Sequence, residues 1–290
     1  MKKIATIGFF DGVHKGHCFL FNHLRRLAAE NALQPLIVTF IEHPRLALQA
    51  DYVPQLLTTF EERKSLLETY GEVLVLSFAQ VQPLTAAQFM EMLHTQYDVS
   101  VLLMGYDHRF GSDRLHRPQD YRLIGRQNGI DVVTLGEFID GEWHVSSTEI
   151  RSALHSGNIV MANELLGRPY SLSGVVVHGN GIGRNIGFPT ANVQPLDPHK
   201  ILPKSGVYAV SVHVDGAEWL PAILNLGTNP TVGNSSQTIE VHIPSFKADL
   251  YGRILEIRFE RFIREEKRFD SLTELREQIA IDVDNNLRLA

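Results

Sequence analysis

The strongest constraint on the fold is a change in the spacing of apolar residues about half way along this chain of 290 residues. In the first half, apolar residues form short continuous runs, and segments with helical spacing separate these runs. Continuous apolar runs are typical of strands in a parallel sheet that is covered on both faces. The alternation of strand and helix predicts a doubly wound α/β domain. The expected strands lie at 3–10, 35–40, 73–78, 99–106 and 130–135.

The second half has apolar residues that alternate with polar ones, as in GVYAVSVHVDG (206–216) and RILEIRFERFI (253–263). A period of two is typical of antiparallel strands, and we expect these strands to close into a small β-barrel. Near the end of the chain, apolar residues recur at three- and four-residue spacing over 272–287. This spacing predicts a helix, which either Ser271 or Asp270 caps.

The length is about twice that of a usual domain, so two domains are expected. We place the first domain at 1–166 and the second at 172–290. The segment LGRPYS combines Gly, Arg and Pro, and residues 167–171 within it are therefore the predicted linker.

Composition argues against several classes of function. The net charge is −6, whereas proteins that coat nucleic acid use an excess of Lys and Arg to neutralise phosphates. The single cysteine, Cys18, excludes an internal disulfide. The sequence has no charged-then-apolar leader and no apolar run of membrane length. We therefore expect a cytoplasmic protein that binds neither nucleic acid nor membranes, as a monomer or a weak homo-oligomer.

The segment TIGFFDGVHKGH (6–17) places His14 and His17 between the first expected strand and the first expected helix. Ligands of open α/β sheets bind at the carboxyl ends of strands, and a helix N-terminus presents free N–H groups to phosphates. Gly16 allows the backbone to approach a nucleotide closely, and the two imidazoles can donate hydrogen bonds to phosphate oxygens. The alternatives are a solvent-exposed turn and a metal site, although no third ligand stands at a suitable spacing.

The segment VSSTEIRSAL (145–154) predicts a second phosphate site, at the start of a later helix. Ser147 and Thr148 supply hydroxyl groups, and Arg151 supplies a guanidinium one turn further on. An ordinary N-cap box would explain the same pattern, because a serine precedes Glu149 at the required spacing. Together with the histidine turn, the segment indicates the two phosphate-binding ends of a nucleotidylyltransferase.

The segment HGNGIGRNIGFPTANV (178–193) has Gly179, Gly181 and Gly183 at the spacing of a dinucleotide fingerprint. Such a fingerprint needs a helix directly after its glycines, so that the pyrophosphate meets the helix N-terminus. Here Pro189 and a second proline soon after it prevent a helix. The dinucleotide interpretation therefore fails, and we predict a glycine flap between two barrel strands that wraps around ATP phosphates.

Thr190 and Asn192 follow the glycines and have their side chains on one face of an extended segment. Their neutral oxygens suit Mg²⁺ that bridges phosphates, since this ion keeps several waters and takes few protein ligands. We therefore expect both residues to contact the metal and ATP.

The first half resembles the adenylyltransferase module of bacterial bifunctional riboflavin kinase/FAD synthetases. That module transfers the adenylyl group of ATP to FMN and releases pyrophosphate, with magnesium. The resemblance implies that His14 and His17 hold the ATP phosphates, and that Ser147, Thr148 and Arg151 grip the triphosphate from the other side. Four segments carry it, in this order: TIGFFDGVHKGH, TFIEHPR (39–45), GYDHRFG (105–111) and VSSTEIR (145–151).

The resemblance also implies that Asp107 and Arg109 lie beside the flavin nucleotide. The sequence departs from the family at this point, because many members have an aromatic residue where His108 stands and an asparagine where Phe9 stands. Asp11 either helps to place a ligand or metal, or forms an Asp-Gly turn.

The segment GFPTAN resembles the signature of riboflavin kinases, and the similarity continues in order through nearly all of 172–290. It implies that Glu240 is the general base that takes the proton from the riboflavin 5′-hydroxyl, although alternation alone would make it an exposed strand residue. It also implies that Arg264 and Glu266 close over the flavin or its phosphate, with a charged surface turn as the alternative. Asn225 is either a turn residue or a ligand contact, and we favour the structural interpretation. The further segments are LPKSGVYAV, AILNLGTNPTVG, IEVHIPSF, DLYGRILEIRF and FIREEKRFDSLTELREQI.

These features together predict a bifunctional flavin cofactor synthase. The barrel is expected to phosphorylate riboflavin to FMN with MgATP, and the α/β domain to adenylate FMN to FAD. One alternative is a chain with one active and one degenerate domain, and another is a flavin carrier without turnover. An RNA binder, suggested by the histidine motif, is disfavoured by the acidic net charge.

Overall fold

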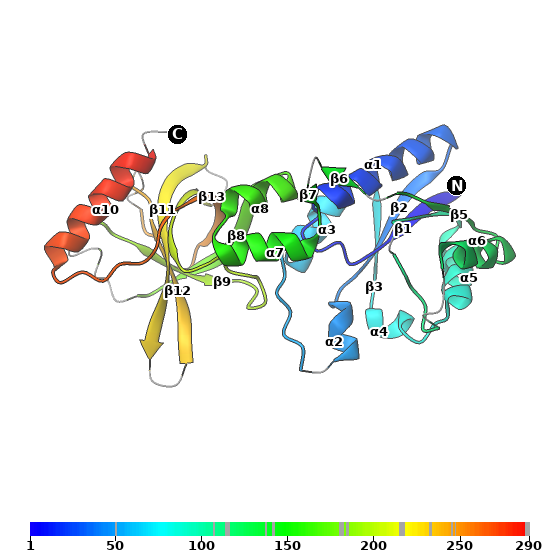
Figure 1. The fold of residues 1–290 in the computed structure, drawn as a ribbon, viewed down its shortest axis with the longest axis horizontal. Helices are drawn as coiled ribbons and strands as arrows, with labels where there is room; N and C mark the ends of the chain where they lie inside the picture. Colours follow the sequence, from blue (N-terminus) through cyan, green and yellow to red (C-terminus); the bar gives the residue numbers. More distant parts are fainter. Residues whose placement is uncertain are drawn as a thin grey trace. The chain divides into compact units, whose positions relative to one another are not determined.

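The structure is a computed structural model that describes residues 1–49, 51–106, 108–113, 117–136, 138–140, 143–179, 183, 186–214, 218–231, 234–244, 246 and 248–287. The chain forms two compact units, Met1–Ser147 and Thr148–Ala290. The first unit contains a parallel sheet and the second a closed barrel (Figure 1). Each unit is described by itself below.

The first unit is built on a five-stranded parallel sheet in the order β3-β2-β1-β4-β5. The strands are β1 (Lys3–Ile7), β2 (Gln34–Phe40), β3 (Glu72–Leu76), β4 (Val99–Met104) and β5 (Asp131–Thr134). All five overlap the predicted apolar runs. The strand order changes direction between β1 and β4, and the crevice at the carboxyl ends of two such strands is where open sheets bind ligands.

Helices cover both faces of this sheet, which explains why its strands are apolar on both faces. Ile4 packs with Phe21 and Leu24 of α1, whereas its neighbour Ala5 packs with Met90 of α5. The helices are α1 (Lys15–Glu30), α2 (Pro44–Leu48), α3 (Phe60–Glu68), α4 (Phe78–Val81), α5 (Ala86–Tyr97) and α6 (Pro118–Gln127). A small ribbon of β6 (Ile139–Asp140) and β7 (Trp143–His144) follows.

The second unit is a closed barrel of antiparallel strands in the order β10-β11-β12-β9-β8-β13. The strands are β8 (Tyr170–Val177), β9 (Ala191–Pro195), β10 (Gly206–Val214), β11 (Leu220–Thr231), β12 (Asn234–His242) and β13 (Ile254–Arg264). The predicted linker includes Tyr170 and Ser171, which already belong to β8 and pair with β13.

The helices described with the barrel are α7 (Ser147–Ser156), α8 (Ile159–Leu166) and α10 (Leu272–Leu287). α8 is fixed to the barrel by Asn163, whose side-chain amide donates to the Phe259 carbonyl at 2.8 Å and accepts from the Tyr170 N–H at 2.7 Å. At the start of α10 the Ser271 hydroxyl accepts a hydrogen bond from the Glu274 N–H at 3.2 Å, as expected of a cap. The predicted fold class, a doubly wound sheet followed by a small barrel with a C-terminal helix, is confirmed.

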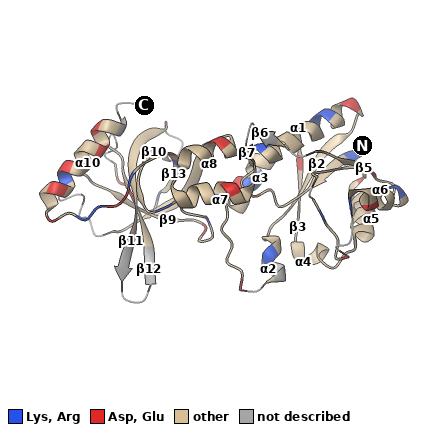
Figure 2. Ribbon diagram, in the orientation of Figure 1, with Lys and Arg blue, Asp and Glu red and all other residues tan. Residues whose placement is uncertain are grey.

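Charged residues of both signs lie along α1 and α10, while most of β1 and β2 carries none (Figure 2). Among the helices that the structure describes, none is both long enough and apolar enough to cross a membrane.

Gly206 offers a test of how closely β10 and β13 approach each other. Its φ is 151°, and a Cβ at this position would lie 2.5 Å from the Phe262 ring and 2.7 Å from the Arg264 carbonyl oxygen. We expect Gly206→Ala to destabilise the barrel by about 1–3 kcal/mol, measured as a lower midpoint of urea unfolding. Gly136→Ala, where a Cβ meets nothing within 4 Å, is the control. Equal midpoints for the two variants would contradict the argument.

Candidate active sites

The turn between β1 and α1 has a strained backbone. Phe10 and Val13 have φ angles of 57° and 41°, on either side of Gly12 at 81°. Positive φ is costly for a β-branched residue, and such strain persists only where the surroundings fix it. Phe10 and Val13 are both buried, so packing contributes to holding the turn.

The Asp11 carboxylate supplies the polar contacts that fix this turn. It is buried and accepts hydrogen bonds from the Leu57 N–H at 3.0 and 3.1 Å, the Thr58 N–H at 3.1 Å and the Thr58 hydroxyl at 3.2 Å. The Gly12 N–H in turn donates to the Thr58 hydroxyl oxygen at 3.0 Å. Of the two interpretations of Asp11 from the sequence, these contacts favour the turn.

His14 and His17 lie together at the start of α1, with ring centroids 3.6 Å apart and ring planes 18° from parallel. His14 is the N-cap, and its Nδ1 accepts the His17 N–H at 3.4 Å. The edge of the Phe10 ring packs against His17. A Cβ on Gly16 would lie 3.2 Å from the His14 ring and 3.4 Å from the Val145 carbonyl oxygen. The predicted pair of histidines is thus assembled at a helix N-terminus, with glycine where space is short.

Ser147, the last residue of the first unit, contacts the turn between β1 and α1. Its hydroxyl donates to the Asp11 carbonyl oxygen at 2.9 Å. Thr148 and Arg151, the other two residues of the predicted second phosphate site, belong to the second compact unit. Their contact with a triphosphate stays a prediction.

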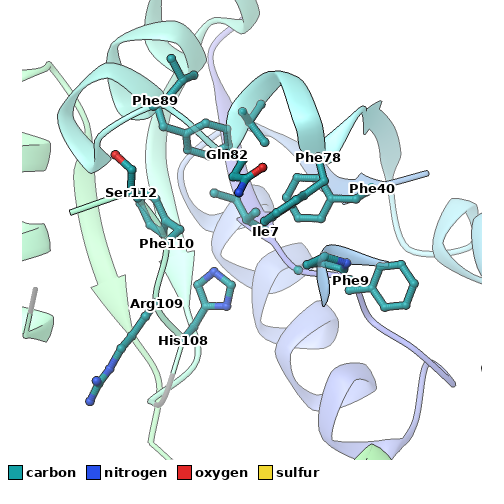
Figure 3. A pocket seen from close by; sticks show the side chains of 15 residues that line it. Ile7, Phe9, Phe40, Phe78, Gln82, Phe89, His108, Arg109, Phe110 and Ser112 are labelled. Atoms are coloured by element: carbon teal, nitrogen blue, oxygen red, sulfur yellow. The ribbon is translucent and has the colours of Figure 1, made fainter. Parts of the chain in front are cut away.

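A cavity of about 470 Å³ opens at the carboxyl ends of β1, β2 and β4 (Figure 3). We name it the aromatic cavity, because its walls include the rings of Phe9, Phe40, Phe78, Phe89 and Phe110. Its polar residues include Gln82, His108, Arg109 and Ser112. Figure 3 shows the Arg109 guanidinium directed away from these rings. Asp107 lies outside the described residues.

Arg63, on α3, lies next to the aromatic cavity and was not found from the sequence. Its side chain is 1% exposed, its Nη2 donates to the Phe40 carbonyl at 2.7 Å, and its Cζ lies 4.0 Å from the centroid of the Phe9 ring. Burial lowers the pKa of Arg63 to about 10, although the nearby Asp11 charge opposes this shift. Its four-residue spacing from Leu67, the other buried residue of α3, is the sequence signal that could have identified it.

In the barrel, a cavity of about 340 Å³ brings together most of the predicted kinase residues. We name it the barrel cavity. Strand register places Asn192 opposite Glu240 and Glu240 opposite Asn225, across β9, β12 and β11. Residues opposite one another in neighbouring strands point to the same face. The Thr190 hydroxyl donates to Glu240 Oε2 at 3.3 Å, so Thr190, Asn192 and Glu240 form one polar cluster at the cavity.

The glycine segment approaches this cluster closely. A Cβ on Gly179 would lie 2.0 Å from Asn192 Nδ2, and one on Gly183 would lie 2.3 Å from the Phe188 carbonyl oxygen and 3.2 Å from Thr190 Oγ1. Only glycine fits at these two positions without displacing backbone or the site side chains. Gly181 lies outside the described residues.

Arg264 lines the barrel cavity, as predicted, but its guanidinium is bound to Asp282 of α10. Nε and Nη2 donate to Asp282 Oδ2 at 3.0 and 2.7 Å, and Gln278 donates to Oδ1 at 3.0 Å. Asp282 is 4% exposed. Glu266 also lines the cavity and reaches β11, where a Cβ on Gly227 would lie 2.7 Å from its Oε1.

The structure adds Asn225, His242, Lys267 and Asp282 to the lining of the barrel cavity. The sequence favours a structural role for Asn225, because its alignment with Glu240 follows only from the strand register. His242 is held by a 2.8 Å hydrogen bond between its Nδ1 and the Pro189 carbonyl. A third cavity, of about 430 Å³, is lined by Val176, Pro189, Ala191, Ile243, Tyr251 and others, and Thr190 lines both it and the barrel cavity.

The polar cluster of the barrel cavity fits a phosphate-bound magnesium ion. Thr190 and Asn192 offer neutral oxygens, and Glu240 is the carboxylate beside them. In the part of the chain that the structure describes, no group of three or more His, Cys, Asp or Glu side chains could hold a metal. Mg²⁺ held mainly by phosphates and water needs no such group.

Comparison with known proteins decides the family. A model described as FAD synthetase matches residues 1–149, and one described as riboflavin kinase matches residues 166–290. The bifunctional riboflavin kinase/FMN adenylyltransferase of Escherichia coli (strain K12) is 39% identical over 286 residues, which cover 96% of this chain and 90% of the relative. The chain belongs to this family. It therefore carries both predicted activities, with the FAD synthetase domain before the riboflavin kinase domain.

Two further proteins are similar to this chain over nearly its full length. The family member of Bacillus subtilis (strain 168) is 35% identical over 298 residues, which cover 99% of this chain and 92% of the relative. A crystal structure described as a macrolide-efflux protein from Streptococcus pneumoniae has a TM-score of 0.90 and 33% identity, and covers 98% of this chain and 93% of that chain. The family resemblance inferred from the sequence is confirmed.

Asp11→Asn tests the contacts that fix the histidine turn. The variant places an amide group where four hydrogen bonds reach a carboxylate, so we expect the first unit to lose about 1–3 kcal/mol of stability. We expect FMN adenylyltransferase activity to fall at least about tenfold, because a 1 Å misplacement is costly in such sites. Kinase activity of the same chain should be unchanged. The exposed Asp131→Asn is the control, and equal adenylyltransferase activity in both variants would contradict this role.

Asp282→Asn tests whether α10 positions Arg264. Removing the charge leaves the Arg264 guanidinium without its buried partner, so we expect the KM for riboflavin to rise about tenfold. Adenylyltransferase activity of the chain should not change. Glu277→Gln, at an exposed site on the same helix, is the control. A riboflavin KM equal to that of the unsubstituted protein would show that Arg264 does not depend on Asp282.

Proposed function

We propose that the aromatic cavity binds FMN and that the histidine turn binds the phosphates of ATP. Flat aromatic walls with a few polar groups suit the flavin ring. The cavity includes Gly8 and Phe9, which directly precede the strained turn. FMN in this cavity would therefore lie beside the N-terminus of α1, where phosphates are stabilised.

In the proposed adenylyl transfer, a phosphate oxygen of FMN attacks the α-phosphorus of ATP. The bond between the α- and β-phosphates breaks, and pyrophosphate leaves. His14 and His17 donate hydrogen bonds to the phosphate oxygens as negative charge develops, while Gly16 leaves room for the nucleotide. No covalent intermediate with the protein is needed, so catalysis rests on positioning and charge stabilisation.

Further residues are proposed to contact the two substrates of this reaction. Ser147, Thr148 and Arg151 are proposed to hold the triphosphate, as hydroxyls and a guanidinium suit phosphate oxygens. Arg109 lines the rim of the aromatic cavity and, with Asp107, is proposed to contact FMN.

For the kinase we propose that riboflavin binds in the barrel cavity and ATP in the cavity lined by Tyr251. One observation carries this assignment: Thr190 lines both cavities and its hydroxyl donates to Glu240. Riboflavin and ATP would thus meet beside the polar cluster of Thr190, Asn192 and Glu240. The flap glycines Gly179, Gly181 and Gly183 are proposed to wrap the ATP phosphates with their backbone N–H groups.

In the proposed phosphoryl transfer, Glu240 takes the proton of the riboflavin 5′-hydroxyl, and the oxygen then attacks the γ-phosphorus of ATP. FMN forms and ADP leaves. Thr190 and Asn192 are proposed to hold Mg²⁺, which when bound neutralises charge on the phosphates. Arg264 and Glu266 are proposed to close over the flavin or its phosphate.

The enzyme is further proposed to act in the cytoplasm, as a monomer or a weak homo-oligomer. Its substrates are small molecules, and a net charge of −6 gives no support for binding to nucleic acid or to anionic membranes.

Two substitutions test the proposed roles on one chain. We expect Glu240→Gln to lower FMN formation by about 10²–10⁴-fold and to leave FAD formation from FMN unchanged. We expect His17→Ala to lower FAD formation by about 10²–10³-fold and to leave FMN formation unchanged.

The measurement is chromatography of the products from riboflavin or FMN incubated with MgATP. A variant that keeps both activities would refute the role of the substituted residue. A variant that loses both activities would indicate misfolding of the chain and not the loss of a catalytic group. Circular dichroism would detect such misfolding.

A further inference from the structure

Arg63 is the largest side chain in the described part of the chain that is less than 2% exposed. A buried guanidinium loses its hydration, and an apolar side chain of similar volume often stabilises a core equally well. Arg63 has no role in either reaction proposed for the enzyme. The burial of its guanidinium beside Phe9 and Phe40 therefore needs another explanation.

The guanidinium of Arg63 connects the end of β2 with Phe9, which lies two residues after the end of β1. Nη2 donates to the Phe40 carbonyl at 2.7 Å and lies 3.5 Å from the Ile41 carbonyl oxygen. Cζ lies 4.0 Å from the centroid of the Phe9 ring, at the distance of a strong cation–π contact. The charge of Asp11 lies near enough to favour the protonated form.

Phe9 is held from several sides. The Thr39 hydroxyl donates to its carbonyl oxygen at 3.3 Å, which fixes the backbone. Its ring meets the His43 ring edge-on, with centroids 4.7 Å apart, and also contacts Arg63. Phe9 is one wall of the aromatic cavity.

We propose that Arg63 is a positioning residue for adenylyl transfer, which holds the Phe9 ring in place as a wall of the FMN cavity. The proposal rests on the assignment of the aromatic cavity to FMN. The planar guanidinium can lie against the ring and donate to the β2 carbonyls at the same time. A lysine ammonium cannot do both, since it lacks the flat fork of donors.

Arg63→Lys, which keeps the charge, tests this role. We expect the KM for FMN to rise about tenfold. The KM for ATP and the kcat of adenylyl transfer should change less than about twofold, because the histidine turn is untouched. Kinase activity of the same chain is the internal control, and Lys64→Ala, at the next and more exposed position of α3, should leave all of these values unchanged. Equal rises in both KM values, or an unchanged KM for FMN, would overturn the proposal.

A double-mutant cycle separates positioning from a merely structural role. Phe9→Leu keeps apolar bulk but has no aromatic face, so we expect it to raise the KM for FMN by itself. If Arg63 acts through Phe9, the Arg63→Lys/Phe9→Leu variant should have the KM of Phe9→Leu alone. Effects that multiply would overturn the role of Arg63 and leave the cavity assignment intact. An unchanged KM for FMN in Phe9→Leu would instead overturn the cavity assignment.

Arg63→Met fills the same space without charge and replaces Arg63→Lys in the cycle if the lysine variant does not fold. The same non-additive effect on the KM for FMN is expected. A multiplicative effect would overturn the proposal here too.

Discussion

The hydrogen bonds between the Asp11 carboxylate and the 57–58 segment are the interaction on which the proposed adenylyltransferase site depends. Four hydrogen bonds from three donors converge on this one buried group. They hold a turn in which Phe10 and Val13 have unfavourable positive φ angles. This turn leads directly into α1 and so sets where the helix begins. Without this anchor the backbone would relax toward ordinary angles, and the two histidine rings would lose their stacked arrangement at the helix N-terminus.

The proposed riboflavin kinase site is built by a different physical means. Its central residues come from three neighbouring strands, and strand register alone aligns Asn225, Glu240 and Asn192 in one row. A shift of register by one residue would turn each of these side chains to the other face of the sheet. The closed barrel prevents such a shift, because every strand is paired on both sides. Stability of the barrel and geometry of the site therefore have the same origin.

Much of this could be predicted from the sequence, because periodicity is local. Continuous apolar runs predicted the parallel sheet, and alternation predicted the barrel. Motif resemblance singled out Glu240, Thr190 and Asn192, which the structure brings together at the barrel cavity, while their roles stay a prediction. The contacts of Arg63 with Phe9 and Phe40, and the Arg264 pair with Asp282, could not be predicted, since each depends on packing between different segments of the chain. Asn225 and Asp11 remained ambiguous for the same reason: strand register and the 57–58 contacts, respectively, decide between their alternatives. Tyr170 and Ser171 were included in the predicted linker because Gly167, Arg168 and Pro169 directly precede them, whereas the structure has both residues in β8.

Thr190 borders two cavities at once, and this has a thermodynamic consequence. If riboflavin and ATP occupy the cavities as proposed, each ligand buries surface of the same side chain and meets the other across it. Occupancy of one cavity then changes the binding free energy of the other, and the effect must be equal in both directions. On this assignment the two substrates of the kinase would be energetically linked through a single threonine, before any bond is made or broken.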